Sequence, residues 1–327
     1  MQTNDLNKNS NMKYQKLIIF IIFVGFIIYG FLTVILSTNN LYTYLLGGAL
    51  FLLLTVGLIF VGKSLTKDSM PKVSLKNFDF VFAFVGVILT YELSNLVSLS
   101  PVFSSAFIGV IGYLFFRKHS VALYCGSFAG MVSPQIFNRY EVIVLGLICA
   151  IIYLLAKTIL DGFGGRLGTI AFVSTTIATL IFNKDMLLPE GTYNIALVFV
   201  FAVLGSVISY YMHHHLKLSP VLSSALPSLL LAGFIDFLLP EYYVYSSVFF
   251  IASFVGMSSN KVIKNLINSL FVGIILGIIF LTFYNYFNGF GGKMGLMALI
   301  SVTINYALIN IIQSKNKNIG KLKISFD

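Results

Sequence analysis

The amino-acid sequence predicts an all-α polytopic membrane protein with about twelve transmembrane helices: an N-terminal hairpin followed by two inverted five-helix repeats. Of its 327 residues, 58% are hydrophobic and 10% are charged, and the mean hydropathy of +0.93 lies far outside the range of soluble domains. The apolar runs are roughly 16 to 22 residues long, which suits helices crossing a hydrocarbon core of about 30 Å rather than barrel strands. Three sequence blocks also occur twice.

The apolar runs divide the chain into five segments. These are an N-terminal tail at 1–16, a transmembrane hairpin with a basic loop at 17–77, a first repeat at 78–190, a second repeat at 191–313 and a C-terminal tail at 314–327. The predicted spans are 17–37, 41–62, 78–97, 101–116, 120–136, 142–160, 167–183, 193–212, 220–238, 242–259, 265–286 and 294–312.

The basic residues predict the orientation of these spans. With twelve spans, all of the 21 Lys and Arg residues except Arg139, Lys184 and Lys293 fall on the side of the two termini. Because basic flanks resist translocation, we expect a protein of the cell (inner) membrane with both termini cytoplasmic. One alternative stays open: if 120–136 and 242–259 are both re-entrant, the chain has ten spans and nearly the same charge distribution.

The duplicated blocks appear in the same order in both halves, as expected after an internal duplication. They are LSPVFSSA at 99–106 and LSPVLSSA at 218–225, SFAGMVS at 127–133 and SFVGMSS at 253–259, and GFGGRLG at 162–168 and GFGGKMG at 289–295. With twelve spans, each half contains five, an odd number, so the second half is inverted relative to the first. In secondary transporters built this way, the solute site lies between the repeats. With ten spans the halves would be parallel.

The serines of the first two blocks are candidate residues of a substrate pathway. Ser100 and Ser219 are good helix N-caps, because proline occupies the first helical position after each of them. The hydroxyls one turn further on could serve close helix packing or line a polar path. They belong to Ser104, Ser105, Ser223 and Ser224.

The second pair of blocks places small residues three positions apart on one helical stripe, which allows close packing. Short, interruptible segments in both halves are also the best sequence indication of a transporter site. We therefore assign to the pathway Ser127, Gly130, Ser133, Ser253, Gly256 and Ser259.

The third pair of blocks predicts a tight glycine turn with an interfacial cation, or a backbone contact for an anion. Neither copy has the context of a nucleotide-binding loop, because no strand precedes it. The residues concerned are Gly164, Gly165, Arg166, Gly291, Gly292 and Lys293.

Few other side chains suggest chemistry. Glu92 lies within a predicted span, where a carboxylate is costly, and it is a candidate for proton or cation coupling; the alternative is that it reaches water at the span end. The triplet His213 to His215 ends a helix, where its rings diverge, so a solvated loop is expected rather than a metal site. No catalytic motif, metal site or cofactor is predicted, and an enzyme is disfavoured.

The segment SPVLSSAL resembles a short stretch of urea channels, over about eight residues in each half. That resemblance implies an architecture of two inverted five-helix halves, and it carries over no binding residue.

These observations favour a transporter or channel that moves a small solute through the interface of the two repeats. Two alternatives are a lipid-handling or envelope-assembly protein, such as a flippase or membrane enzyme, and a non-transporting scaffold or sensor. The expected partners are membrane lipids and a small solute, and the chain could also form a homo-oligomer. The basic residues lie in loops and tails, where they set topology, so no nucleic-acid partner is expected.

Overall fold

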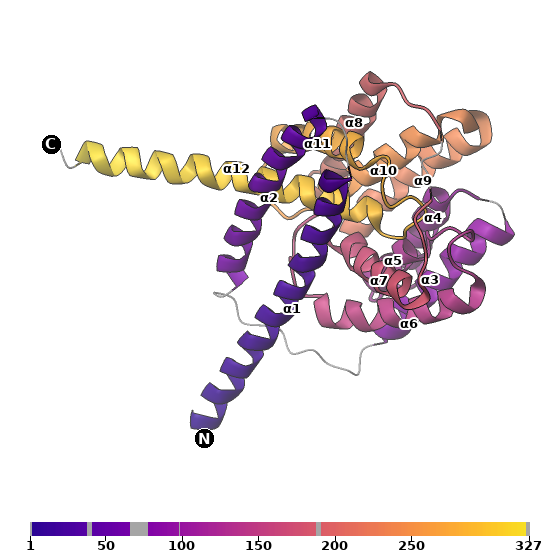
Figure 1. Cartoon of the computed structure of the whole chain (residues 1–327), viewed down its shortest axis with the longest axis horizontal. Helices are drawn as coiled ribbons and strands as arrows, with labels where there is room; N and C mark the ends of the chain where they lie inside the picture. The colour runs from indigo at the N-terminus through magenta and orange to yellow at the C-terminus, as the bar shows by residue number, and fades with distance from the viewer. Residues whose placement is uncertain (1, 38–40, 66–77, 98, 188–190, 325–327) are drawn as a thin grey trace.

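The computed structural model describes the chain at 2–37, 41–65, 78–97, 99–187 and 191–324, with side chains from 15 to 314 apart from 38–43, 64–77, 98 and 188–190. The regular secondary structure of these residues is helical, apart from one isolated bridge, and turns and loops connect the helices. Figure 1 shows two long helices at the N-terminus lying beside a body of shorter ones. They are α1 (Gln2–Leu36) and α2 (Leu41–Leu65). Helix α1 begins at Gln2, so it includes most of the segment predicted as an N-terminal tail.

The two predicted repeats each contain five α-helices. The first half comprises α3 (Asp79–Leu96), α4 (Pro101–Phe115), α5 (Ser120–Ala129), α6 (Arg139–Ala156) and α7 (Arg166–Phe182). The second half comprises α8 (Ile195–His214), α9 (Pro220–Leu238), the 3₁₀ turn η1 (Pro240–Tyr242), α10 (Tyr243–Gly256), α11 (Leu266–Phe283) and α12 (Lys293–Ile324). In Figure 1, α12 leaves the body as a long helix toward the C-terminus and includes most of the predicted C-terminal tail.

Eight of the described helices are long and apolar enough to cross a membrane, and α4, α5 and α7 are apolar but shorter. Helix α5 has 10 residues and α10 has 14, lengths of roughly 15 and 21 Å at 1.5 Å per residue, against a hydrocarbon core of about 30 Å. The predicted spans 120–136 and 242–259 are therefore short helices followed by non-helical chain. Length and composition support eight spans, and the count of twelve stays a prediction.

The same helix pairs pack against each other in both halves. Helix α3 packs on α5 and α6, and α8 packs correspondingly on α10 and α11. Between the halves, α4 packs on α9 and α7 packs on α12. Two backbone hydrogen bonds connect the halves reciprocally: Ser133 N donates to Gly289 O at 2.9 Å, and Ser259 N donates to Gly162 O at 2.8 Å.

Local sequence explains how the paired helices begin. Ser100 accepts a hydrogen bond from the amide of Phe103, and Ser219 accepts one from the amide of Leu222, both at 3.1 Å. Each serine satisfies an amide that the first helical turn leaves unpaired, and proline follows as the first helical residue. The predicted helix N-caps are confirmed.

Glycine allows α7 and α12 to cross in close contact. A Cβ atom on Gly168 would lie 2.5 Å from Gly295 Cα, a separation that only two glycines tolerate. Before the helices, Gly165 and Gly292 adopt φ values of +83° and +81°, which side chains rarely permit. The duplicated heptapeptides thus form matching turns at this crossing.

Candidate functional site

Two cavities lie at the interface of the halves. The larger, which we call the Lys293 cavity, has a volume of about 470 Å³ and is walled by residues of both halves. Its polar wall includes Asn95, Ser133, Gln135, Ser247 and Asn288, besides Lys293. Its apolar wall includes Met131, Ile251, Phe280, Met294 and Met297.

The smaller cavity, which we call the Arg166 cavity, has a volume of about 330 Å³. It is also walled by both halves, because Val121 and Phe128 come from the first and Phe254 and Ser259 from the second. Its charged wall is formed by Asp161 and Arg166, with His213 nearby.

The walls of the two cavities correspond position by position. Residues of the same repeated blocks line each cavity, and most members of the Arg166 cavity wall have a counterpart in the Lys293 cavity wall at an offset of 119, 126 or 127 residues. The pairs are Pro101 and Pro220, Ser133 and Ser259, Asp161 and Asn288, Gly165 and Gly292, and Arg166 and Lys293.

Four aromatic rings of α5 and α10 pack together where the halves meet. Tyr124 and Phe128 of α5 pack with Phe250 and Phe254 of α10, and every one of these side chains is buried. The ring centroids of Phe128 and Phe254 are 4.8 Å apart, those of Tyr124 and Phe128 4.4 Å, and those of Phe250 and Phe254 4.7 Å. We call these four residues the aromatic cluster.

Helices α5 and α10 each extend from one cavity to the other. Val121 and Phe128 line the Arg166 cavity, and Met131, just beyond the end of α5, lines the Lys293 cavity. In the opposite order, Ser247 and Ile251 of α10 line the Lys293 cavity, and Phe254 lines the Arg166 cavity. The aromatic cluster therefore lies on the two helices that contribute residues to both cavities, and two of its rings form part of the Arg166 cavity wall.

The predicted pathway serines flank the aromatic cluster in pairs. Ser105 Oγ lies 2.8 Å from Ser127 Oγ, and Ser224 Oγ lies 2.7 Å from Ser253 Oγ. The Tyr124 hydroxyl also lies 3.1 Å from Ser224 Oγ, which ties α5 of one half to α9 of the other. All four serines are buried and line neither cavity, and their hydroxyls join α5 to α4 and α10 to α9.

The other residues of those blocks divide between packing and cavity wall. A Cβ on Gly130 would lie 2.3 Å from Val87 O, and one on Gly256 would lie 2.3 Å from Tyr210 N, so both glycines allow helices to touch. Ser133 and Ser259 line the two cavities. Two more serines remain buried in α4 and α9: Ser104, whose hydroxyl has no hydrogen-bond partner among the described residues, and Ser223, which donates to Pro220 O.

The predicted glycine turns bring their cations to the cavity walls. Arg166 Nη1 donates to Lys157 O and to Asp161 Oδ1, both at 2.7 Å. Lys293 Nζ donates to the equivalent carbonyl, Tyr284 O, at 3.2 Å and to Asn288 Oδ1 at 2.8 Å. Gly164, Gly165 and Gly292 line the cavities beside these cations, whereas Gly291 packs against Ala129 O.

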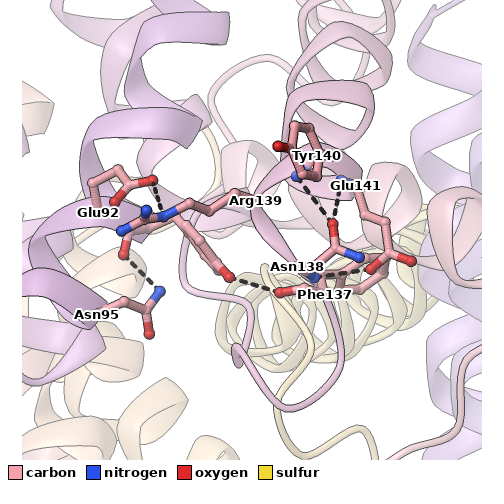
Figure 2. Close-up of polar contacts among 8 residues, drawn as sticks. Glu92, Asn95, Phe137, Asn138, Arg139, Tyr140 and Glu141 are labelled. Atoms are coloured by element: carbon pink, nitrogen blue, oxygen red, sulfur yellow. Dashed lines mark hydrogen bonds and ion pairs between the residues drawn. The ribbon is translucent and has the colours of Figure 1, made fainter.

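Glu92 lies outside both cavities. Its Oε1 pairs with Arg139 Nε at 3.1 Å, next to the capping box in which Asn138 and Glu141 begin α6 (Figure 2). The other oxygen, Oε2, is buried and has no hydrogen-bond partner in the part of the chain that the structure describes. Because the Glu92 side chain lines neither cavity, its position gives no support to the predicted coupling role.

Sequence reasoning missed the aromatic cluster and the acidic and amide positions of the turns. Phe128 and Phe254 are the second residues of the SF.GM.S blocks, and Tyr124 aligns with Phe250 at the same offset of 126 residues (124 to 250). That alignment was a usable signal, but aromatic residues in an apolar helix look like ordinary core. Asp161 and Asn288 likewise align at an offset of 127 and were not compared.

The described part of the chain forms a helical fold with eight helices long and apolar enough to cross a membrane, which is compatible with a multi-pass membrane protein, and its two halves meet at two cavities. The chain matches no protein-family model, and no curated protein or solved structure is significantly similar to it.

Proposed function

We propose that this protein is a membrane transporter or channel, in which a small solute passes between the Lys293 cavity and the Arg166 cavity. The observation that carries the proposal is the presence of two cavities with corresponding walls, both lined in part by α5 and α10, the helices that carry the aromatic cluster. A solute moving from one cavity to the other would follow α5 and α10 past the aromatic cluster.

An inverted arrangement of the halves supports this proposal. The contact from Ser133 to Gly289 has its counterpart from Ser259 to Gly162, and such reciprocity is characteristic of a two-fold relation between units. If the two-fold axis lies in the membrane plane, the two cavities face opposite sides. Transporters with inverted repeats place their sites near the midplane, beside short or broken helices such as α5 and α10.

The aromatic cluster closes the route in this conformation. An apolar constriction excludes water and ions until it widens, which is a common way of gating a pore. Phe128 is one of two central rings of the cluster, because it contacts Tyr124, Phe250 and Phe254, just as Phe254 contacts the other three. We expect opening to require movement of this ring.

Stopped-flow light scattering of proteoliposomes tests the proposal, with formamide and glycerol as permeants. Replacing Phe128 by Ala removes a central ring, and we expect this variant to raise the permeability to at least one permeant several-fold above protein-free liposomes. Phe137→Ala is the matched control, because Phe137 is equally buried but lines neither cavity and lies outside the cluster. Either substitution costs about 3–5 kcal/mol of stability.

Comparing Phe128→Ala with Phe137→Ala distinguishes opening of the proposed route from general destabilisation of the fold. Permeability that is higher for Phe128→Ala than for Phe137→Ala supports a route through the cluster. Equal permeability in Phe128→Ala proteoliposomes and protein-free liposomes for both permeants contradicts it.

A further inference from the structure

The Lys293 cavity contains a cation without a carboxylate partner. Lys293 Nζ bonds a carbonyl and an amide oxygen, and it forms no ion pair within the described part of the chain. Among the residues that the structure describes, no Asp or Glu lines the cavity. Asp236 of α9, which lies close to Ser100 of the wall, is not among the residues that line the cavity. An ammonium group within a membrane protein is costly without a counter-charge.

The Arg166 cavity shows how the other half meets the same requirement. There Asp161 occupies the position of Asn288 and forms an ion pair with Arg166 at 2.7 Å. The remaining contact of the turn is unchanged, because each cation also bonds the carbonyl nine residues before it. One aligned position thus carries a negative charge in the first half and none in the second.

Further donors surround the uncompensated cation. Asn288 Oδ1 accepts from Lys293, so Nδ2 is the remaining polar atom of that side chain, and it is buried without a hydrogen-bond partner among the described residues. Helix α12 begins at Lys293, and the positive end of its dipole adds to the same field.

The apolar wall limits the kind of anion that suits the site. Methionine, isoleucine and phenylalanine side chains form much of the wall, and a volume of about 470 Å³ is in the range of small-molecule sites. A strongly hydrated inorganic ion would leave this surface unused. An anion with a compact apolar body would fill it and place its charge at Lys293.

We propose that the Lys293 cavity binds a small organic monocarboxylate, whose carboxylate accepts hydrogen bonds from Lys293 Nζ and Asn288 Nδ2. This assignment rests on the proposed function, since it names the class of solute that the route would carry. In the absence of transport it would still describe a binding site.

Isothermal titration calorimetry on the detergent-purified full chain tests the site, with sodium hexanoate and its neutral isostere hexanamide at constant ionic strength. We expect hexanoate to bind at least tenfold more tightly than hexanamide. Asn288→Asp should weaken hexanoate binding tenfold or more, because it gives Lys293 the carboxylate that Arg166 already has, and the turn should still form. Asn194→Asp is the control and should leave hexanoate affinity unchanged, because Asn194 lines neither cavity and aspartate can accept the same hydrogen bond from Ala196 N at the start of α8.

Three results would overturn the proposal: equal affinities for hexanoate and hexanamide, unchanged hexanoate affinity in Asn288→Asp, or displacement of hexanoate by phosphatidylglycerol, which would assign the site to lipid phosphate. These failures are distinct from failure of the proposed function. Flux of neutral formamide without hexanoate binding would contradict only the anion site. Hexanoate binding without any flux would contradict only the transport route.

Discussion

At the scale of single residues, chemistry in this protein depends on what each charged group faces. Arg166 and Lys293 make the same two kinds of contact, yet only Arg166 meets a carboxylate. The sequence predicted both cations correctly as parts of duplicated turns. It did not predict their different surroundings, because the deciding residues, Asp161 and Asn288, belong to the approach to each turn rather than to the repeated heptapeptide.

Glu92 provides a residue-scale prediction. Its carboxylate pairs with Arg139, whose side chain is 59% exposed, so the pair should contribute no more than about 1 kcal/mol to stability. Because Glu92 lines neither cavity, we expect Glu92→Gln to leave the solute flux of proteoliposomes, and its dependence on pH, unchanged. Flux would be measured between pH 5 and 8, with wild type in parallel. Loss of a pH dependence that wild type shows would restore the coupling role predicted from sequence.

At the scale of elements, the glycine crossing of α7 and α12 holds the two halves together. A methyl group on Gly168 would meet the backbone of Gly295, which cannot rotate away as a side chain can. We therefore expect Gly168→Ala to lower the free energy of unfolding by about 1–3 kcal/mol. Thermal unfolding followed with a thiol-reactive dye measures this directly, because both cysteines, Cys125 and Cys149, are buried in the folded chain.

Gly25→Ala is the matched control for that experiment. Gly25 lies within α1, and a Cβ there would meet nothing within 4 Å, so a methyl group fits without movement. Its unfolding temperature should equal or exceed that of wild type, since alanine favours the helix. If Gly168→Ala unfolded at the same temperature as Gly25→Ala, close contact at the crossing would not be important for stability.

The helices themselves were largely predictable, whereas their lengths and pairings were not. Apolar runs located nearly every helix, and proline after serine located the starts of α4 and α9. The lengths of α5 and α10 were overestimated, because each apolar run continues past the end of its helix, at Ala129 and Gly256. The chain that follows is not helical, and its backbone groups form hydrogen bonds with other parts of the protein. Pairing of Ser105 with Ser127 depends on tertiary packing, which periodicity does not encode.

At the scale of the whole molecule, duplication is the feature that connects sequence, fold and proposed function. The order of the repeated blocks predicted two corresponding halves, and the matching helix contacts and turns agree with that expectation. The cavities and the aromatic cluster could not be predicted, because they form only where residues of both halves meet. The orientation of the halves across the membrane stays a prediction that the reciprocal contacts favour.

Accessibility of the two cavities from the two sides of the membrane tests this account most directly. Ser133→Cys and Ser259→Cys place single thiols at corresponding positions of the Lys293 and Arg166 cavities, in a chain whose Cys125 and Cys149 are replaced by Ala. A membrane-impermeant maleimide would be applied to right-side-out and inside-out vesicles. We expect the two variants to be labelled from opposite sides. Labelling of both from the same side would contradict inverted halves and a route between the cavities.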